Sequence, residues 1–440
     1  MSSYVPSTEE QRLEMLKAVG VSSFEDLYAD VPEGMRLKEG DLKLPDGMSE
    51  MEMLAKMKEL AAENKIFSSI FRGAGAYNHY IPSVVKRVTA KEEFVTAYTP
   101  YQAEISQGVL QSIFEYQTMI CELTGMEASN ASVYDGASAA AEAVAMCRDR
   151  RRNKVLISGA SNPEVIKVVK TYCFGSGVEC VIIPAKEGKT DIAALKDALD
   201  ETVAGVYVHQ PSFYGVLEDC SAIADVTHEA GALFIMGINP IVASVVKSPA
   251  ECGADIAVGE GQPLGMPMAF GGPYLGFMAC REKLQRKLPG RIVGQTTDDA
   301  GRRCFVLTLQ AREQHIRREK ASSNICSNEA LCALTAAVYM GTMGPNGLRE
   351  VANQCYAKAH YLATQITEIP GFSLVYPGSF FNEFVTTCPG CTDELLSALE
   401  EKDILGGLPV EEGILWCATE LNSKEQIDGL VSAIKEVFGK

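Results

Sequence analysis

Segment 134–146 of the sequence, YDGASAAAEAVAM, has residue types that hold small anionic groups. Gly136 and Ser138 stand at the start of an alanine-rich helix. The first N–H groups of a helix have no partner within it, so they can bind an anion. The segment therefore predicts an anion cradle, and a well-packed alanine helix with a serine in its first turn remains the alternative.

Segment 258–272, VGEGQPLGMPMAFGG, follows an apolar run and is built like a loop that carries reactive groups. It contains no Lys, His, Asp, Ser or Cys, and Glu260 is its only ionisable side chain. We therefore expect a close-packed turn in which the catalytic position has been vacated.

The elements that position these segments alternate between strand-like and helix-like runs. A helix is expected from Asn162 and Pro163 to Gly175 and Gly177, and a longer one over residues 102–125. The strand candidates are apolar throughout, which is typical of parallel strands covered on both faces. They are KVLIS (154–158), VECVIIP (178–184), GVYVHQP (205–211), ALFIMGI (232–238), DIAV (255–258) and LGFMAC (275–280).

The predicted fold class is α/β, with three parts. Residues 1–65 form a helical arm, with a capping box from Ser7 to Glu10, a helix end at Gly20 and a second helix over 50–63. Residues 66–320 form a large, doubly wound, mainly parallel sheet domain. Residues 321–440 form a small α+β domain, in which two strands, a helix, two strands and a helix follow helices that end near residue 369.

This layout is that of pyridoxal phosphate (PLP) enzymes of the aminotransferase class, fold type I, by analogy of fold alone. Such enzymes need a phosphate cradle, an Asp beside the pyridine nitrogen and a Schiff-base Lys. The Asp should end strand 232–238, where Met236 and Gly237 stand. The Lys should lie near Gln262, but the only lysine between residues 226 and 282 is Lys247, which precedes the strand. Two of the three groups are therefore absent.

Three long segments, 97–143, 258–277 and 312–331, resemble the glycine cleavage system P-protein family, and within it the α chain, or subunit 1, of the split bacterial enzymes. The resemblance covers nearly the whole chain, including FNEFV (381–385). It implies the non-lysine half of a glycine dehydrogenase (decarboxylating), in an α2β2 assembly whose subunit 2 carries the Lys and holds PLP. The implied reaction decarboxylates glycine and passes the aminomethyl group to the lipoyl group of the H-protein.

Segment 98–108, YTPYQAEISQG, holds the candidates for lining the partner's active site. Because the same string occurs in P-proteins that carry the lysine, we favour a site or interface role over a helix that starts at Pro100 with packed tyrosines. His79 is expected near this loop, more as a packed or interfacial residue than as a proton carrier. The candidates in the loop are Tyr98, Thr99, Tyr101, Gln102 and Glu104.

Two basic runs interrupt an otherwise acidic chain. The cations of 147–154 are expected to face the negative end of a helix dipole. The second run is compatible with an anion site or with salt bridges between subunits, and we favour salt bridges because the protein is acidic. Its cations are Arg312, Arg317, Arg318 and Lys320.

Composition excludes several classes of protein. A net charge of −17 and a pI near 4.9 argue against nucleic-acid binding. The N-terminus lacks the features of a secretory signal, and the most apolar window, 232–246, is too short to span a bilayer, so a cytoplasmic protein is expected. The fourteen cysteines lack metal-ligand spacing, so no metal site is expected.

Three other functions are weighed against the leading hypothesis. The first is an autonomous PLP lyase that uses Lys247, and the second is a purely structural paralogue of a catalytic chain. The weakest is a thiol oxidoreductase built on Cys388 and Cys391, because this CxxC pair lies late in the chain.

Overall fold

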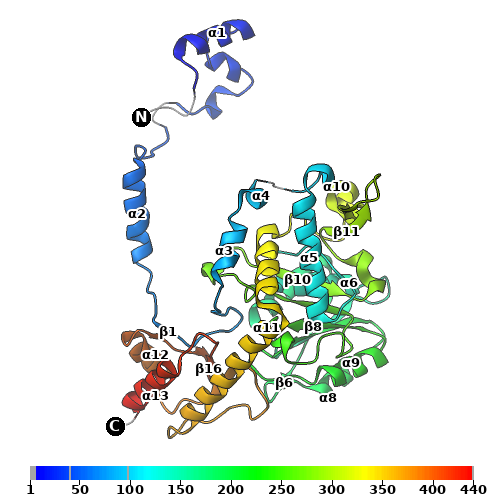
Figure 1. Cartoon of the computed structure of the whole chain (residues 1–440), viewed down its shortest axis with the longest axis vertical. Helices are drawn as coiled ribbons and strands as arrows, with labels where there is room; N and C mark the ends of the chain where they lie inside the picture. The colour runs from blue at the N-terminus through cyan, green and yellow to red at the C-terminus, as the bar shows by residue number, and fades with distance from the viewer. Residues whose placement is uncertain (1–5, 39–40, 97–98, 439–440) are drawn as a thin grey trace. The chain divides into compact units, whose positions relative to one another are not determined.

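A computed structural model describes residues 6–38, 41–96 and 99–438, and the chain divides into two compact units, Met1–Ile66 and Phe67–Lys440. The first unit contains α1 (Glu9–Val19) and α2 (Glu50–Ala62) (Figure 1). Gly20 closes α1 in the left-handed conformation, as predicted. The capping box of α1 is formed by Thr8 and Gln11 instead of Ser7 and Glu10, because the helix begins one residue later than expected.

A seven-stranded sheet runs through the second unit in the order β2-β10-β9-β8-β7-β3-β4. The five strands from β9 to β4 are parallel. The expectation that 275–280 is also parallel is wrong, because β10 is antiparallel to both β9 and β2. Its connection from β9 contains no crossover helix, so the chain returns in the opposite direction. The strands are β2 (Ala128–Ser129), β3 (Lys154–Ser158), β4 (Glu179–Ile183), β7 (Val203–Gln210), β8 (Leu233–Ile238), β9 (Ile256–Glu260) and β10 (Gly276–Cys280).

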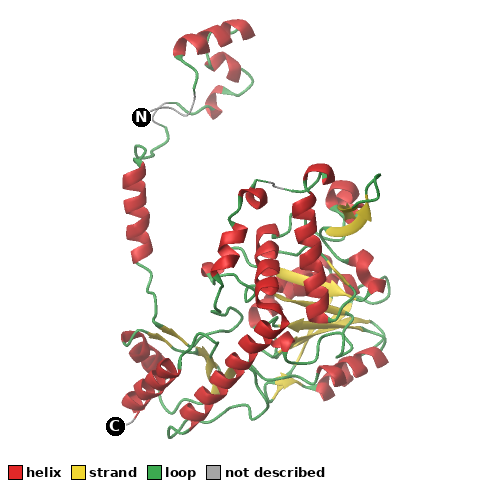
Figure 2. Cartoon of the chain, viewed as in Figure 1, coloured by secondary structure: helices red, strands yellow, loops and turns green. Residues whose placement is uncertain are grey.

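Helices cover both faces of this sheet (Figure 2). Phe234 and Met236 of β8 point into one core and Ile235 into the other, which explains why the strands are apolar throughout. One face is covered by α5 (Gln107–Thr124), α8 (Ile192–Ala198), α9 (Cys220–Glu229) and the first half of α11 (Ala330–Thr367), and the other by α6 (Gly136–Cys147) and α7 (Pro163–Ser176). Asn162 caps α7 and Gly177 ends it, as predicted.

A β-hairpin, β11 (Ile292–Thr297) and β12 (Arg303–Thr308), follows the sheet. The sequence did not indicate it, and its residues Val293 and Phe305 pack with α5. A short helix, α10 (Gln314–Arg317), comes next. The long helix α11 is broken at Gly344, whose φ of 61° is not helical and which precedes Pro345.

The C-terminal region has its own core around the buried Trp416. The predicted order of two strands, a helix, two strands and a helix is wrong, since one strand precedes α12 and three follow it. Leu374, in the missing strand, forms only a single bridge with Thr386. The elements are β13 (Glu383–Thr386), α12 (Thr392–Glu401), β14 (Ile404–Leu405), β15 (Leu408–Val410), β16 (Gly413–Cys417) and α13 (Lys424–Phe438).

Short elements complete the fold. They are β1 (Ser69–Ile70), which pairs with β14, α3 (Ser83–Thr89), α4 (Glu92–Val95), and the β5 (Ala185–Lys186) and β6 (Lys189–Thr190) pair. The boundary at residue 320 between a large and a small domain stays a prediction. Within the described ranges, no helix has the length and apolar character needed to span a bilayer.

Candidate functional site

A cavity of 310 Å³ lies at the carboxyl ends of β7, β8 and β9. Open α/β sheets bind their ligands at this edge. The N-terminus of α6 reaches the cavity through Gly136, and segment 73–77 closes another side. Among the described residues that line it there is no Lys and no Arg. The cavity therefore has the position of a cofactor site without its usual cations.

The predicted anion cradle is a helix N-terminus, and an anion from this chain already lies in it. Asp135 caps α6 by accepting the N–H of Ser138 at 2.7 Å. The Glu260 carboxylate, at the end of β9, accepts the N–H of Gly136 at 2.9 Å through Oε2. Its Oε1 accepts the N–H groups of Gln262 at 2.9 Å and Leu275 at 3.1 Å. Glu260 thus takes the place that a phosphate group would need.

Glu260 packs closely against Gly136, and its burial is also reflected in its pKa. A Cβ added to Gly136 would lie 2.8 Å from the backbone nitrogen and from the Cβ of Glu260. Burial raises the pKa of Glu260 to about 7, against the lowering effect of its three N–H donors. A second anion would therefore meet a filled space and, above pH 7, a second negative charge.

The position of the missing Asp, at Met236 and Gly237, is also filled. Met236 is buried in the core on one face of the sheet. A Cβ on Gly237 would lie 2.6 Å from both Tyr207 Oη and His209 Cδ2, so these two side chains occupy the space of a longer residue. His209 donates its Nδ1–H to the carbonyl of Pro211 at 2.7 Å, and burial lowers its pKa. His209 therefore offers a neutral ring and no carboxylate.

Gln262, where the Schiff-base Lys was expected, ties its loop to segment 73–77. It is buried, accepts the N–H of Tyr77 at 2.9 Å, and donates to the carbonyls of Tyr77 at 2.9 Å and Met266 at 2.8 Å. Lys247 is exposed and does not line the cavity. The described lining therefore offers no amine for covalent capture of an aldehyde cofactor.

Sequence reasoning missed the buried Glu383 on the opposite wall. Its carboxylate accepts the N–H of Ala74 and the hydroxyl of Tyr77, both at 2.6 Å. Burial raises its pKa to about 7 and that of Tyr77 well above its ordinary range. A charged residue between phenylalanines in FNEFV is the only local signal that could have indicated this buried role.

The residues of this cavity do not fit PLP. Of the three groups that would hold it, the Schiff-base Lys and the Asp for the pyridine nitrogen are missing, and Glu260 fills the phosphate cradle.

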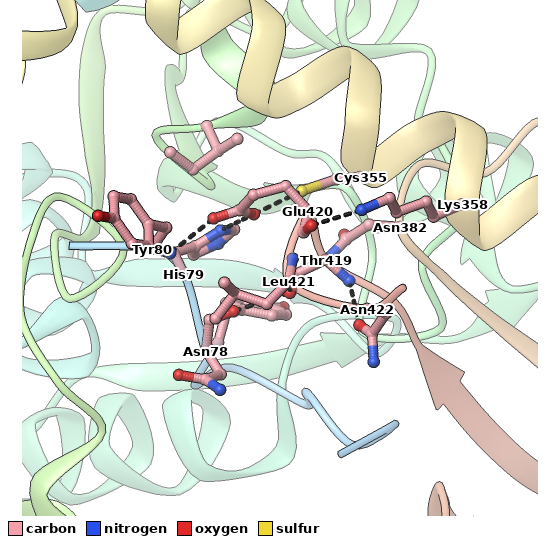
Figure 3. A network of polar contacts seen from close by, with 12 residues as sticks. Asn78, His79, Tyr80, Cys355, Lys358, Asn382, Thr419, Glu420, Leu421 and Asn422 are labelled. Atoms are coloured by element: carbon pink, nitrogen blue, oxygen red, sulfur yellow. Dashed lines mark hydrogen bonds and ion pairs between the residues drawn. The ribbon is translucent and has the colours of Figure 1, made fainter. Parts of the chain in front are cut away.

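His79 lies in a buried network with Glu420 (Figure 3). Its Nδ1 is 2.7 Å from Glu420 Oε2, and Glu420 also accepts the N–H of Tyr80 at 2.7 Å and the thiol of Cys355 at 3.3 Å. Although burial tends to raise it, these bonds lower the pKa of Glu420. His79, Cys355 and Glu420 bring ligand-type atoms within 4.8 Å, but Glu420 is the shared hydrogen-bond acceptor of the group. Lys358 Nζ donates to the Glu420 carbonyl at 2.5 Å.

The loop before α5 faces outward. Tyr98 lies outside the described residues, and Thr99 is half-buried. Tyr101 is 61% exposed and receives a hydrogen bond of 3.4 Å from Arg291, whose guanidinium lies 5.5 Å from its ring centre. Gln102 and Glu104 are exposed.

Helix α5 starts at Gln107, so the alternative in which Pro100 starts the helix is wrong. Among the described residues, no hydrogen bond or ring contact joins this loop to His79.

The fold is that of the PLP enzymes of fold type I. An alanine–glyoxylate aminotransferase from Nostoc superposes with a TM-score of 0.59 over 92% of this chain and 100% of its own, at 16% identity. A P-protein structure in inhibitor-bound form superposes with a TM-score of 0.94 over 99% of this chain and 100% of its own, at 44% identity.

The family follows from the sequence comparisons. Residues 2–434 match the family model described as glycine cleavage system P-protein, and the chain belongs to that family. A probable glycine dehydrogenase (decarboxylating) subunit 1 from Desulfitobacterium hafniense is 50% identical over 99% of both chains. One from Moorella thermoacetica is 49% identical over 99% of both.

Proposed function

We propose that this chain is the α subunit of a glycine dehydrogenase (decarboxylating) and holds no PLP itself. The relatives named subunit 1 and the P-protein family support this assignment. The single observation that carries it is the Glu260 carboxylate on the N–H of Gly136, because it fills the cradle that the cofactor phosphate needs.

We propose further that a second chain, subunit 2, holds PLP in an α2β2 assembly with this one. Bound there, the cofactor supplies the electron sink for the carbanion left when glycine loses carbon dioxide. The aminomethyl group then passes to the lipoyl group of the H-protein. No step of this chemistry uses the cavity of the α chain, and the cytoplasm is the expected compartment.

The contribution of this chain is to close the partner's site. Glycine has few atoms and offers little binding energy, so the surrounding protein must preorganise the site and exclude water. The exposed polar groups of Tyr101, Gln102 and Glu104 suit such a lining in trans, with Thr99 beside them. Arg291 holds the Tyr101 ring in place through its hydrogen bond and its cation–π contact. Tyr98 and His79 stay predictions for this lining, and His79 would act through its buried bond to Glu420.

Helix α2 presents an apolar surface that the first unit does not cover. Within that unit the helix has no buried residue, and its large apolar side chains are exposed. A helix of this kind needs another surface to cover it. The exposed apolar residues are Met51, Met53, Leu54, Met57 and Leu60.

The assignment is tested by assaying the two chains apart and together. Release of carbon dioxide from carboxyl-labelled glycine, with H-protein present, should require both chains. Tyr101→Ala should lower kcat by about tenfold or more without dissociating the complex. Tyr356→Phe, on an exposed tyrosine of α11, is the matched control and should change nothing.

Two results distinguish the alternatives. Turnover by this chain alone would establish an autonomous lyase, for which the exposed Lys247 has no place in the cavity. Full turnover in the Tyr101→Ala complex would point to a purely structural paralogue.

A further inference from the structure

A second cavity, of 290 Å³, lies beside the last turn of α6. Ala145 and Met146 of that turn line it, and Glu142 is the one carboxylate among its described lining residues. All its other charged lining residues are cations, in a chain whose net charge is −17. They are Arg148, Arg286, Lys287, Arg312, Arg317 and Lys320.

These cations come from separate elements that the fold brings together. Arg148 caps the C-terminus of α6, and Lys287 ends the 3-10 turn Glu282–Lys287. Arg317 ends α10, and Lys320 ends the turn Arg318–Lys320. Between them Arg318 has a φ of 55°, a left-handed conformation that a non-glycine residue adopts at a cost. The convergence is therefore a feature of the tertiary structure and not of one basic run.

The hydrogen bonds of these cations leave most of their charge unmatched. Lys287 donates to the carbonyl of Met146 at 2.8 Å, at the negative end of the α6 dipole. Arg312 donates to the carbonyls of Leu309 at 2.9 Å and Gly290 at 2.7 Å. Across the described ranges, none of the six cations forms an ion pair with this chain.

Two guanidinium nitrogens of this group are buried without an acceptor. They are Nε of Arg148 and Nη1 of Arg312. A buried donor on a charged group that lacks an acceptor is unfavourable. An anion in the cavity can supply one only when these side chains turn toward it. The sequence favoured salt bridges to another subunit here, but cations gathered around a cavity suit a compact ligand better than a flat contact.

We propose that this cavity binds a phosphate group, either inorganic phosphate or the phosphate of a small monoester. A phosphate dianion presents several oxygens at once, and guanidinium forks from different elements can bind it together. The volume is enough for the phosphate and a small organic group. This proposal stands whether or not the chain acts as a glycine dehydrogenase subunit.

The one carboxylate in the lining does not oppose this charge strongly. Glu142 accepts a hydrogen bond from Ser323 at 2.8 Å. Burial raises the pKa of Glu142 to about 7, so much of it is neutral near that pH.

The test is calorimetric titration of the full-length chain with inorganic phosphate, adenosine monophosphate and succinate. Phosphate or the monoester should bind at one site with a Kd of about 1 mM or below, and succinate at least about tenfold more weakly. Tighter binding of the monoester than of phosphate would identify an ester as the ligand, and equal binding would identify phosphate itself.

Single substitutions distinguish phosphate binding at this cavity from general attraction of phosphate to positive charge. Arg148→Gln and Arg317→Gln should each weaken phosphate binding about tenfold or more, because each removes a charge-assisted donor. Arg148→Lys should weaken it as well, since Lys keeps the charge and loses the fork. Arg302→Gln, on the hairpin and already paired with Asp298 at 2.8 Å, is the control and should bind as the wild type does.

Some outcomes would overturn the proposal. No binding to the wild-type chain up to about 10 mM phosphate would mean that the cations serve another protein chain. Equal weakening by Arg302→Gln, or tighter binding of succinate than of phosphate, would show general charge attraction without a site.

Arg312 is not substituted in this test, because its bonds to the carbonyls of Gly290 and Leu309 support the fold.

Discussion

The two ends of helix α6 differ in how their charge is matched. At the N-terminus, the chain supplies its own anion, Glu260, and the described lining of the cavity has no cation. At the C-terminus, six cations surround a second cavity and none has an ion-pair partner in the described chain. Both ends have the sign of charge that the helix dipole favours.

This difference indicates which end of α6 has charge left to bind a ligand. Glu260, Gln262 and the Tyr207–His209 pair fill the places where a cofactor would attach. The C-terminal end instead holds buried guanidinium donors without acceptors. One fold thus has a cavity whose expected cofactor contacts are made by its own side chains, and a second, basic cavity that its structural class does not explain.

The largest effect is expected from Gly237→Asp, which restores a carboxylate at the pyridine position. Its Cβ would clash with Tyr207 and His209, and its charge would be buried without a cation. We expect a loss of about 4 kcal/mol or more in the free energy of unfolding, measured by urea denaturation. Gly237→Ala isolates the steric part. An Asp variant as stable as the wild type would mean that this position is not filled.

Glu260→Ala should open the N-terminal end of α6. It removes the acceptor of three N–H groups, and we expect a loss of about 3 kcal/mol. Phosphate should then stabilise this variant more than it stabilises the wild type, because an external anion can take the place of the carboxylate.

Glu218→Ala is the control for Glu260→Ala. It removes another buried carboxylate, one that accepts the N–H of Thr190 at 2.8 Å and no N–H group of α6. It should gain no more from phosphate than the wild type does. An identical phosphate response in all three proteins would contradict the role of Glu260.

Glu142, in the C-terminal half of α6, makes the free energy of unfolding depend on pH. Its pKa is raised by burial from 4.5 to about 7, so the folded protein binds this proton more tightly than the unfolded chain. The stabilisation is complete below pH 4.5 and is lost as the pH rises through 7. Relative to Glu142→Gln, the wild type should lose up to about 3 kcal/mol over that range. Parallel urea curves for the two proteins across this range would show that Glu142 is not the source.

The smallest effect is expected from Arg317→Gln without phosphate. Because Arg317 has no ion pair and several cations nearby, its removal should change stability by less than about 0.5 kcal/mol, or raise it slightly. Lys283→Gln is the contrasting variant, since Lys283 pairs with the buried Asp255 at 2.9 Å, and should cost about 1 kcal/mol. Thermal unfolding of both would measure the difference. A larger loss from Arg317→Gln would reveal a partner for it within the chain.

Local signals predicted much of the scaffold. The run at 154–158 is a strand with those bounds, and the caps at Asn162 and Gly177 enclose α7 as expected. Each depends on residues adjacent in the sequence. The absence of the Lys and the Asp was also readable, because their positions follow from strand order.

Features that depend on contacts between residues distant in the sequence were not predicted. Glu260 was noticed as the only ionisable residue of its loop, but its bond to Gly136 joins residues 124 positions apart. The antiparallel direction of β10 depends on a connection without a helix. The basic cavity unites Arg148 with Arg286 and Arg317, which the sequence places in separate segments.

The central claim is that this chain's own side chains occupy the contacts that would anchor a cofactor in the first cavity. The most direct measurement is to incubate the purified full-length chain with PLP, reduce with borohydride and map any adduct by mass spectrometry. We expect no stoichiometric adduct on any lysine, while subunit 2 treated in the same way should carry one. A stoichiometric adduct on a single lysine of this chain would contradict the account.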